Sequence, residues 1–151
     1  MRLLTIYFLL FLNVNLFAQI KIDQVGDNWV SQVESSILYL KENDSQKYHL
    51  FETYCKRISF WNGNYSSTEG NDVIVISLSD MKLNSIENLS TILVHESKHL
   101  EILNNSKVYD EQTEECICYE YELEYLLNLK DCPFFLIQNC KKKILLYCND
   151  F

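Results

Sequence analysis

The stretch around which the chain is organised is Thr91-Ile-Leu-Val-His-Glu-Ser-Lys-His-Leu100, which contains the pattern His-Glu-x-x-His in an otherwise apolar run. It holds two of the chain's three histidines. Because four residues make about one turn of an α-helix, His95 and His99 lie on the same side of a helix. Both imidazoles can then bind one Zn²⁺, while Glu96 acts as general base toward a water on the metal. The pattern therefore predicts a metal-dependent hydrolytic site.

The segment around this pattern predicts an α-helix with clear ends. Asn84 or Ser85 can accept the N-cap hydrogen bond, and Glu87 can return it in a capping box. No glycine or proline interrupts the segment before Asn104-Asn105, which are typical of a helix C-terminus.

The helical period also predicts which side of this helix is buried. At about 100° per residue, apolar residues form one stripe, Ile86, Leu89, Leu93, Leu100 and Leu103, and polar residues fall on the far side, Ser90, Ser97, Lys98 and Glu101. Glu96 lies near the middle of the apolar stripe, with the two histidines at its margin. A carboxylate among leucines is costly unless it has a partner, so a solvated face does not account for Glu96. A zinc-bound water supplies a partner, and burial would raise the pKa of Glu96 toward that of a useful base.

The N-terminal segment, residues 1–18, has the layout of a secretory signal peptide. One basic residue precedes an apolar run from Leu3 to Leu12, and Ala18 stands at the expected cleavage position. The run is about half the ~20 residues that a membrane-spanning helix needs. We expect cleavage after Ala18, a secreted or periplasmic protein, and no stable membrane span in the mature chain.

The remainder, residues 19–151, has the size of one domain. The formal net charge of the whole chain is −8. Such an acidic chain has no electrostatic footprint for nucleic acid or for an anionic membrane surface. The sequence leaves the oligomeric state open.

Cysteine usage agrees with export. An even number of cysteines in an exported chain favours disulfides, and this chain has six, Cys55, Cys116, Cys118, Cys132, Cys140 and Cys148. Five of them follow residue 115, so we expect the C-terminal part to be linked to itself or back to the first cysteine. Neighbours two apart on a helix point about 200° apart and do not pair with each other. A disulfide-rich helical part is therefore expected over about residues 131–151.

Patterning elsewhere predicts an α+β protein that is predominantly α-helical. An amphipathic helix is expected over residues 27–43, and a second from Ser45 to near Trp61, in which His49 is expected to be a surface or packed residue rather than a metal ligand. Residues 62–71 are predicted to form a loop, and residues 72–79 a strand that leads toward the motif helix. This strand either has an unpaired edge that could add an extended peptide or is a buried strand that only packs on the helix. A further helix is expected from Asp110 to about residue 130, and Pro133 suits the first turn of the last one.

A catalytic zinc site needs a third protein ligand, and the helix that starts at Asp110 is rich in glutamate. His95-Glu96-x-x-His99 followed by a helix reading Glu115-x-x-Cys118-Tyr119 resembles the gluzincin class of zinc metallopeptidases. The resemblance implies a minimal zincin-like domain, with a short β element beside the metal helix and Zn²⁺ as the cofactor. It also implies that the third ligand is Glu115.

The same resemblance assigns roles to neighbouring residues of that helix. Tyr119 stands where the class has an aspartate that orients a histidine, and Glu122 is a candidate to replace that aspartate. Glu114 and Glu122 remain alternatives to Glu115 as third ligand. The long metzincin form of the motif is absent, because Ile102 and Asn105 stand where that form has glycine and histidine.

The leading hypothesis is a secreted zinc-dependent hydrolase, specifically a metallopeptidase acting on a peptide or protein substrate. Four tyrosines are candidate donors to the developing oxyanion, Tyr109, Tyr119, Tyr121 and Tyr125. One alternative is a closed, non-catalytic zinc site of the Cys₂His₂ type, made by His95, His99, Cys116 and Cys118. Another is a metal-free interaction module on a degenerate peptidase fold.

Overall fold

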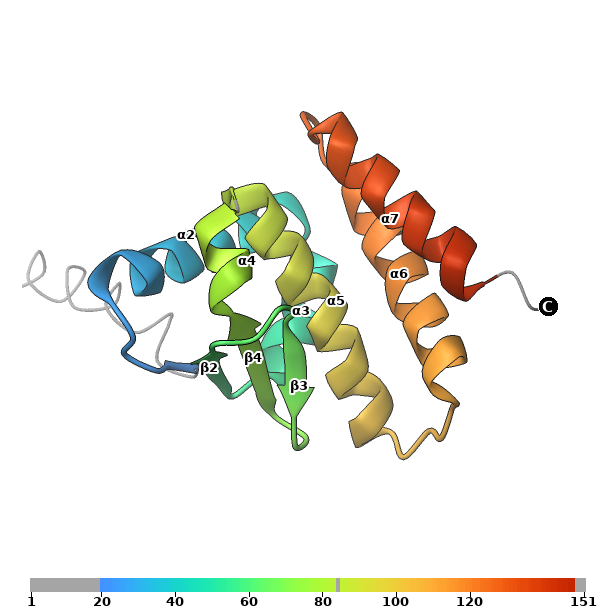
Figure 1. Cartoon of the computed structure of the whole chain (residues 1–151), viewed down its shortest axis with the longest axis horizontal. Coiled ribbons are helices and arrows are strands. Elements are labelled where there is room, and N and C mark those ends of the chain that lie inside the picture. Colours follow the sequence, from blue (N-terminus) through green and yellow to red (C-terminus); the bar gives the residue numbers. More distant parts are fainter. Residues whose placement is uncertain (1–19, 84, 149–151) are drawn as a thin grey trace, which may run out of the picture.

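The computed structural model describes residues 20–83 and 85–148, which are mostly helical with a small four-stranded sheet (Figure 1). The predicted α+β class with a predominance of helix is confirmed. The elements are β1 (Lys21–Ile22), α2 (Asp27–Asn43), α3 (Ser45–Tyr54), β2 (Arg57–Trp61), β3 (Ser67–Glu69), β4 (Val73–Ser77), α4 (Leu78–Leu83), α5 (Ile86–Asn104), α6 (Glu111–Asn128) and α7 (Phe134–Tyr147).

The sheet has the strand order β1-β2-β4-β3, with β1, β2 and β4 parallel and β3 antiparallel. The predicted strand is β4, whose β-branched residues favour extended backbone. It lies inside the sheet, since Ile74 pairs with Ile58 of β2 and with Thr68 of β3. The expected open edge on this strand is therefore wrong. The strand at that edge is β3, which forms within the segment predicted to be a loop.

The second helix is shorter than its apolar pattern predicted. Helix α3 ends at Tyr54, and the residues expected to continue it form β2 instead. Ile58 and its aromatic neighbours favour a strand once a partner strand is present, and Ile58 is fully buried. The N-cap is Asp44 rather than Ser45, because its carboxylate accepts the backbone N–H groups of the next turn, including that of Lys47 at 3.0 Å.

Helix α5, which carries the histidine motif, is enclosed by other elements. Helices α2 and α3 and strands β3 and β4 contact it from the N-terminal half of the chain, and α6 contacts it from the C-terminal half. In Figure 1 it lies between the sheet and the α6–α7 hairpin. Ser85 caps it by accepting the Asn88 N–H at 3.3 Å, as predicted for one of the two candidate caps.

The predicted division of α5 into an apolar and a polar side is only partly correct. Ser90 and Ser97, placed on the polar side, are fully buried, whereas Ile86 and Leu103 are exposed at the helix ends. The serines tolerate burial because their hydroxyls donate to main-chain carbonyls one turn back, at 2.7 and 2.8 Å. Their small size lets neighbouring elements approach the helix on that side.

A buried lysine joins the N-terminal half of the chain to α6. Lys47 of α3 is 4% exposed, and its Nζ lies 2.7 Å from Glu124 Oε2. The same ammonium lies 3.4 Å from the ring centroid of Tyr121. The carboxylate and the aromatic face together compensate for the desolvation of this charge.

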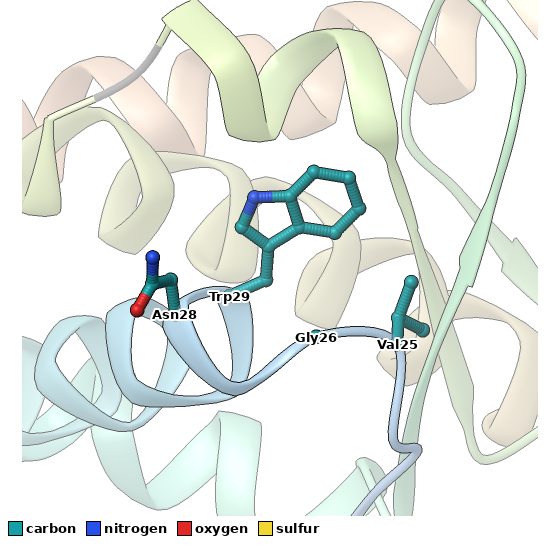
Figure 2. A pocket seen from close by; sticks show the side chains of 4 residues that line it. All are labelled: Val25, Gly26, Asn28 and Trp29. Carbon is teal, nitrogen blue, oxygen red and sulfur yellow. The ribbon is translucent and has the colours of Figure 1, made fainter.

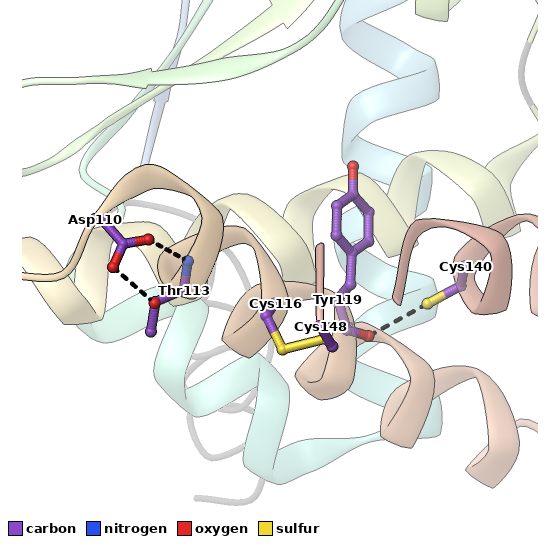
Figure 3. Close-up of a disulfide and its surroundings, with 6 residues drawn as sticks. All are labelled: Asp110, Thr113, Cys116, Tyr119, Cys140 and Cys148. Atoms are coloured by element: carbon purple, nitrogen blue, oxygen red, sulfur yellow. Dashed lines mark hydrogen bonds between the residues drawn. A yellow bond between two sulfur atoms is a disulfide. The ribbon is translucent and has the colours of Figure 1, made fainter. Parts of the chain in front are cut away.

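Helices α6 and α7 form an antiparallel hairpin linked by the disulfide Cys116–Cys148 (Figure 3). The expected covalent link within the C-terminal part is therefore confirmed. The expectation that the other cysteines also pair is wrong, since Cys55, Cys118, Cys132 and Cys140 are free thiols. The sulfurs of Cys55, Cys132 and Cys140 contact backbone carbonyl oxygens instead.

A pocket of about 380 Å³ opens at the start of α2 (Figure 2). It is lined by Val25, Gly26, Asn28 and Trp29, none of which has an ionisable side chain. Its described lining therefore offers no histidine, cysteine or carboxylate.

The predicted signal segment, residues 1–18, lies outside the described residues. Among the helices in the described ranges, none is both long and apolar enough to cross a membrane. His49, expected to be a surface or packed residue rather than a metal ligand, is exposed on α3.

Replacing both members of the disulfide, Cys116→Ser with Cys148→Ser, should lower the free energy of unfolding. The bridge closes a loop of sequence separation 32, for which the loss is about 2–4 kcal/mol. Urea denaturation of the oxidised proteins measures this difference. Cys132→Ser is the control, because that thiol is unpaired, and an unchanged unfolding midpoint in the double variant would contradict the assignment.

Candidate metal centre

The candidate centre lies where α5 and α6 pack against each other. Helix α5 contributes His95, Glu96 and His99, and α6 contributes three glutamates and one cysteine. The start of α6 is fixed by its N-cap, because the Asp110 carboxylate accepts the Thr113 N–H and Oγ1–H, both at 2.9 Å (Figure 3). This cap holds the first turn of α6 beside the end of α5.

The side chains of three potential ligands converge between the two helices. His95 Nε2 and His99 Nε2 are 3.2 Å apart. The Glu115 carboxylate faces both, with Oε2 3.5 Å from His95 Nε2 and Oε1 3.4 Å from His99 Nε2. Ligands at zinc bond lengths of about 2.0–2.1 Å in a tetrahedron are about 3.3 Å from one another. The three side chains therefore already have the mutual spacing of ligands to one such ion.

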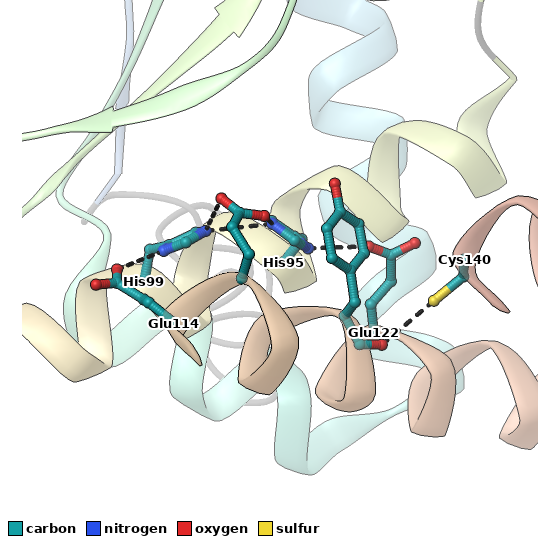
Figure 4. A network of polar contacts seen from close by, with 7 residues as sticks. His95, His99, Glu114, Glu122 and Cys140 are labelled. Carbon is teal, nitrogen blue, oxygen red and sulfur yellow. Dashed lines mark hydrogen bonds and ion pairs between the residues drawn. The ribbon is translucent and has the colours of Figure 1, made fainter. Parts of the chain in front are cut away.

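A second set of carboxylates lies on the outer side of each imidazole (Figure 4). His95 Nδ1 is 3.0 Å from Glu122 Oε2, and His99 Nδ1 is 2.6 Å from Glu114 Oε1. If each Nδ1 carries the proton and donates it, each Nε2 keeps a lone pair directed toward the convergence point. Carboxylates in these positions orient the rings and increase the basicity of the Nε2 atoms.

These contacts bear on the alternatives for the third ligand. Glu114 and Glu122 bind the Nδ1 side of the rings, whereas Glu115 faces the Nε2 side. From the sequence, Glu122 was predicted to be a residue that could orient a histidine, whereas Glu114 was predicted only as an alternative third ligand. The role of Glu114 as a partner of His99 could have been suspected from its place next to Glu115. If Glu115 faces the histidines, its neighbour Glu114 lies close to the same part of the opposing helix.

Glu96 occupies the buried position that the helical period predicted. It is 6% exposed, and burial raises its pKa. Within the described ranges, its carboxylate forms no hydrogen bond or ion pair with the polypeptide. The enclosed side-chain oxygens that lack a partner in the described residues do not include those of Glu96, and the nearby imidazoles of His95 and His99 oppose the effect of burial on its pKa.

The charge balance of the centre favours a cation. Four carboxylates, Glu96, Glu114, Glu115 and Glu122, surround the two imidazoles. Burial by itself would lower the pKa of His95, but hydrogen bonds to Glu115 and Glu122 raise it to about 10. Burial would likewise raise the pKa of Glu115, but hydrogen bonds to the histidines lower it to about 2. The donor set thus attracts positive charge and fits a divalent ion.

The cysteines proposed for a closed site are not both free to bind metal. Cys116 is in the disulfide, so the Cys₂His₂ hypothesis lacks one of its four ligands. Its neighbours Glu120 and Cys148 form a second group of close ligand atoms, but both sulfurs of that group belong to the bridge. Cys118 is free, and its Sγ lies within 4.8 Å of a ring nitrogen of each motif histidine.

Two of the four candidate tyrosines have structural partners away from the centre. The Tyr125 hydroxyl lies 2.9 Å from Ser90 Oγ in the core. The ring of Tyr121 lies under the ammonium groups of Lys47 and Lys98, at 3.4 and 4.8 Å from the ring centroid. Both contacts stabilise packing between helices.

Tyr119 is the candidate tyrosine whose ring borders the histidines. Its centroid lies 4.4 Å from that of His95, and on the other side it stacks on Tyr147 at 5.6 Å. Burial, together with the nearby carboxylates Glu115 and Glu122, raises the pKa of Tyr119, so its hydroxyl keeps its proton. Tyr109 lies in the exposed segment before α6.

No family model, curated protein or solved structure matches this chain. The class of site is therefore defined by its own residues, namely two histidines and a glutamate around one point, with a buried glutamate beside them.

Removing either outer carboxylate should weaken metal binding. Glu114→Ala and Glu122→Ala are each expected to reduce affinity for Zn²⁺ by about 10–100-fold, because each leaves one ring without its orienting partner. Competition with a chromophoric chelator measures the affinity. Glu120→Ala is the matched control, being an exposed glutamate of the same helix. Unchanged affinity in both variants would show that these carboxylates do not support the site.

Proposed function

We propose that the protein is a secreted or periplasmic zinc-dependent hydrolase, and specifically a metallopeptidase of the gluzincin type with a minimal zincin-like domain. One observation carries this proposal. The Nε2 atoms of His95 and His99 and the carboxylate of Glu115 lie 3.2–3.5 Å from one another, beside the buried Glu96. The signal segment predicted at residues 1–18 is the reason for placing the activity outside the cytoplasm.

The ligand types favour zinc over other biological cations. Imidazole suits zinc and other late transition metals, whereas calcium and magnesium prefer all-oxygen sites. Two histidines and one carboxylate are the protein ligands of a common class of catalytic zinc site, which keeps a further position open. When bound there, Zn²⁺ would polarise a substrate carbonyl and lower the pKa of a water in that position.

Glu96 is assigned the role of general base. Its side chain is buried beside the two histidines and forms no hydrogen bond with another described residue, so it can accept the proton of the attacking water. Burial raises its pKa, which brings it closer to the range in which proton transfer is efficient. The same carboxyl group can then deliver that proton to the leaving amine.

Tyr119 is assigned the role of donor to the developing oxyanion. Its ring lies against His95, and its raised pKa keeps the hydroxyl protonated. Figure 3 shows the ring projecting from α6 on the side away from the Cys116–Cys148 bridge. A neutral hydroxyl beside the metal ligands can stabilise negative charge as it forms on the substrate.

The sheet supports a peptide as the substrate. The edge strand β3 contacts α5, and its side facing away from β4 has no partner strand in the described residues. An extended peptide can pair with such an edge through main-chain hydrogen bonds, which would hold it beside the motif helix. The sequence predicted that β4 would pair with the peptide. Because β3 is the edge strand on that side of the sheet, we assign peptide pairing to β3.

One observation favours the alternative of a non-catalytic zinc-binding or interaction module. Cys118 lies close enough to both histidines to compete for the metal position that hydrolysis requires. Metal loading without turnover of peptides would support that alternative.

Glu96→Gln should abolish most of the hydrolytic activity while preserving the metal. Loss of the general base is expected to cost about 10²–10⁴-fold in turnover of a peptide library. Zinc content by elemental analysis should stay at one per chain, because Glu96 is not a ligand. Glu101→Gln on the same helix is the control. Unchanged turnover in Glu96→Gln would refute the mechanism, and chelation should stop turnover until Zn²⁺ is restored.

Two tyrosine variants separate catalysis from packing. Tyr119→Phe should lower kcat roughly 10²-fold with little change in KM or zinc content, since one oxyanion donor is lost. Tyr125→Phe should leave kcat unchanged and lower the free energy of unfolding by about 1 kcal/mol, since it removes the hydrogen bond to Ser90. Steady-state kinetics and urea denaturation measure the two effects. Equal kcat in both variants would remove Tyr119 from the mechanism.

A further inference from the structure

The four free thiols differ in whether their sulfur atoms form hydrogen bonds. Three of them approach backbone carbonyl oxygens at 3.2–3.7 Å, and these are Cys55, Cys132 and Cys140. Cys118 is fully buried and forms no hydrogen bond with any residue in the described ranges. Among the free thiols in the described ranges, only that of Cys118 lacks a hydrogen-bond partner.

This sulfur lies close to the two histidines of the candidate metal centre. Cys118 Sγ lies within 4.8 Å of ring nitrogens of His95 and His99, and those nitrogens are themselves close together. Cys118 follows Glu115 by three residues on α6, so both side chains lie on the same face of that helix. Glu115-x-x-Cys118 therefore opposes His95-x-x-x-His99 across the α5–α6 interface.

We propose that Cys118 is a fourth ligand of the metal ion and closes the site in the resting protein. This inference rests on the metal site of the proposed function. Thiolate is among the strongest zinc ligands, and two imidazoles, one carboxylate and one thiolate complete a tetrahedral set. As the sulfur–metal bond forms, the S–H bond breaks and the proton leaves to solvent.

The consequence is that the Cys118 sulfur and the attacking water compete for the fourth position on the metal, which would regulate activity. With Cys118 bound, the ion has four protein ligands and no place for the attacking water. Hydrolysis then requires the sulfur to leave and recover its proton. The chain would in this way be metal-loaded but latent, and removal of the sulfur would open the site.

Cobalt substitution tests the ligand directly, without reference to turnover. Co²⁺ added to the metal-free wild-type protein should give visible ligand-field bands together with an intense near-ultraviolet sulfur-to-cobalt charge-transfer band. Cys118→Ser should lose the charge-transfer band and keep the visible bands. Cys132→Ser is the matched control, because its thiol donates to a carbonyl outside the centre, and it should keep both.

The outcomes separate this inference from the proposed function. Visible bands without the charge-transfer band in the wild-type protein would overturn Cys118 as a ligand and leave the metal site standing. Failure of cobalt or zinc to bind at all would overturn the metal site itself. The wild-type spectrum decides the point even if Cys118→Ser does not fold, and Cys118→Ala provides a second variant.

Activity tests the closing role separately. With equal zinc loading, Cys118→Ala should hydrolyse peptides faster than the wild-type protein, whereas Cys132→Ser should match it. Equal or lower turnover in Cys118→Ala would overturn closure by this thiol.

Discussion

The packing of α6 against α5 is the contact on which the candidate site depends. It brings four carboxylates and two imidazoles into one largely buried interface, where charge without compensation is costly. The histidines share this charge through both ring nitrogens, since His95 and His99 each contact one carboxylate at Nδ1 and Glu115 at Nε2. The histidines of this arrangement belong to a group of residues that could hold a metal ion.

The rest of the fold holds these two helices in place. Helix α5 is packed by the sheet and by α2 and α3, so its motif lies on a rigid element. Helix α6 is fixed at its start by the Asp110 cap, and along its length by α7 and the Cys116–Cys148 bridge. Lys47 joins α3 to α6 through Glu124 and Tyr121. Sites held on packed helices keep their ligand geometry better than sites on loops.

The same interface contains the two groups that decide what a bound metal could do. Glu96 is buried on α5 beside the two histidines, which suits the role of base proposed for it. Cys118 is buried on α6 and forms no hydrogen bond with another described residue, which suits a sulfur that excludes water from the metal position. Under the proposed function, Glu96 would serve hydrolysis by a bound metal, and Cys118 as a ligand would prevent it.

Much of this protein follows from local sequence alone. The helical period places His95 and His99 on one side of a helix and Glu96 in a buried position, and the caps Ser85 and Asp110 mark where α5 and α6 begin. These features depend on neighbours within one turn, which a single sequence contains. The family resemblance pointed to Glu115, whose side chain does face both histidines.

Only the tertiary structure decided the remaining features, because they depend on residues distant in the chain. Ile58 became part of a strand because β4 offers a partner, and Ser90 and Ser97 are buried because elements pack on both sides of α5. Glu114 became a histidine partner, and Cys116 paired with Cys148, through the side-by-side placement of helices that no local pattern specifies. Periodicity within a segment predicts which way a side chain points, whereas its partner is determined by how the segments pack.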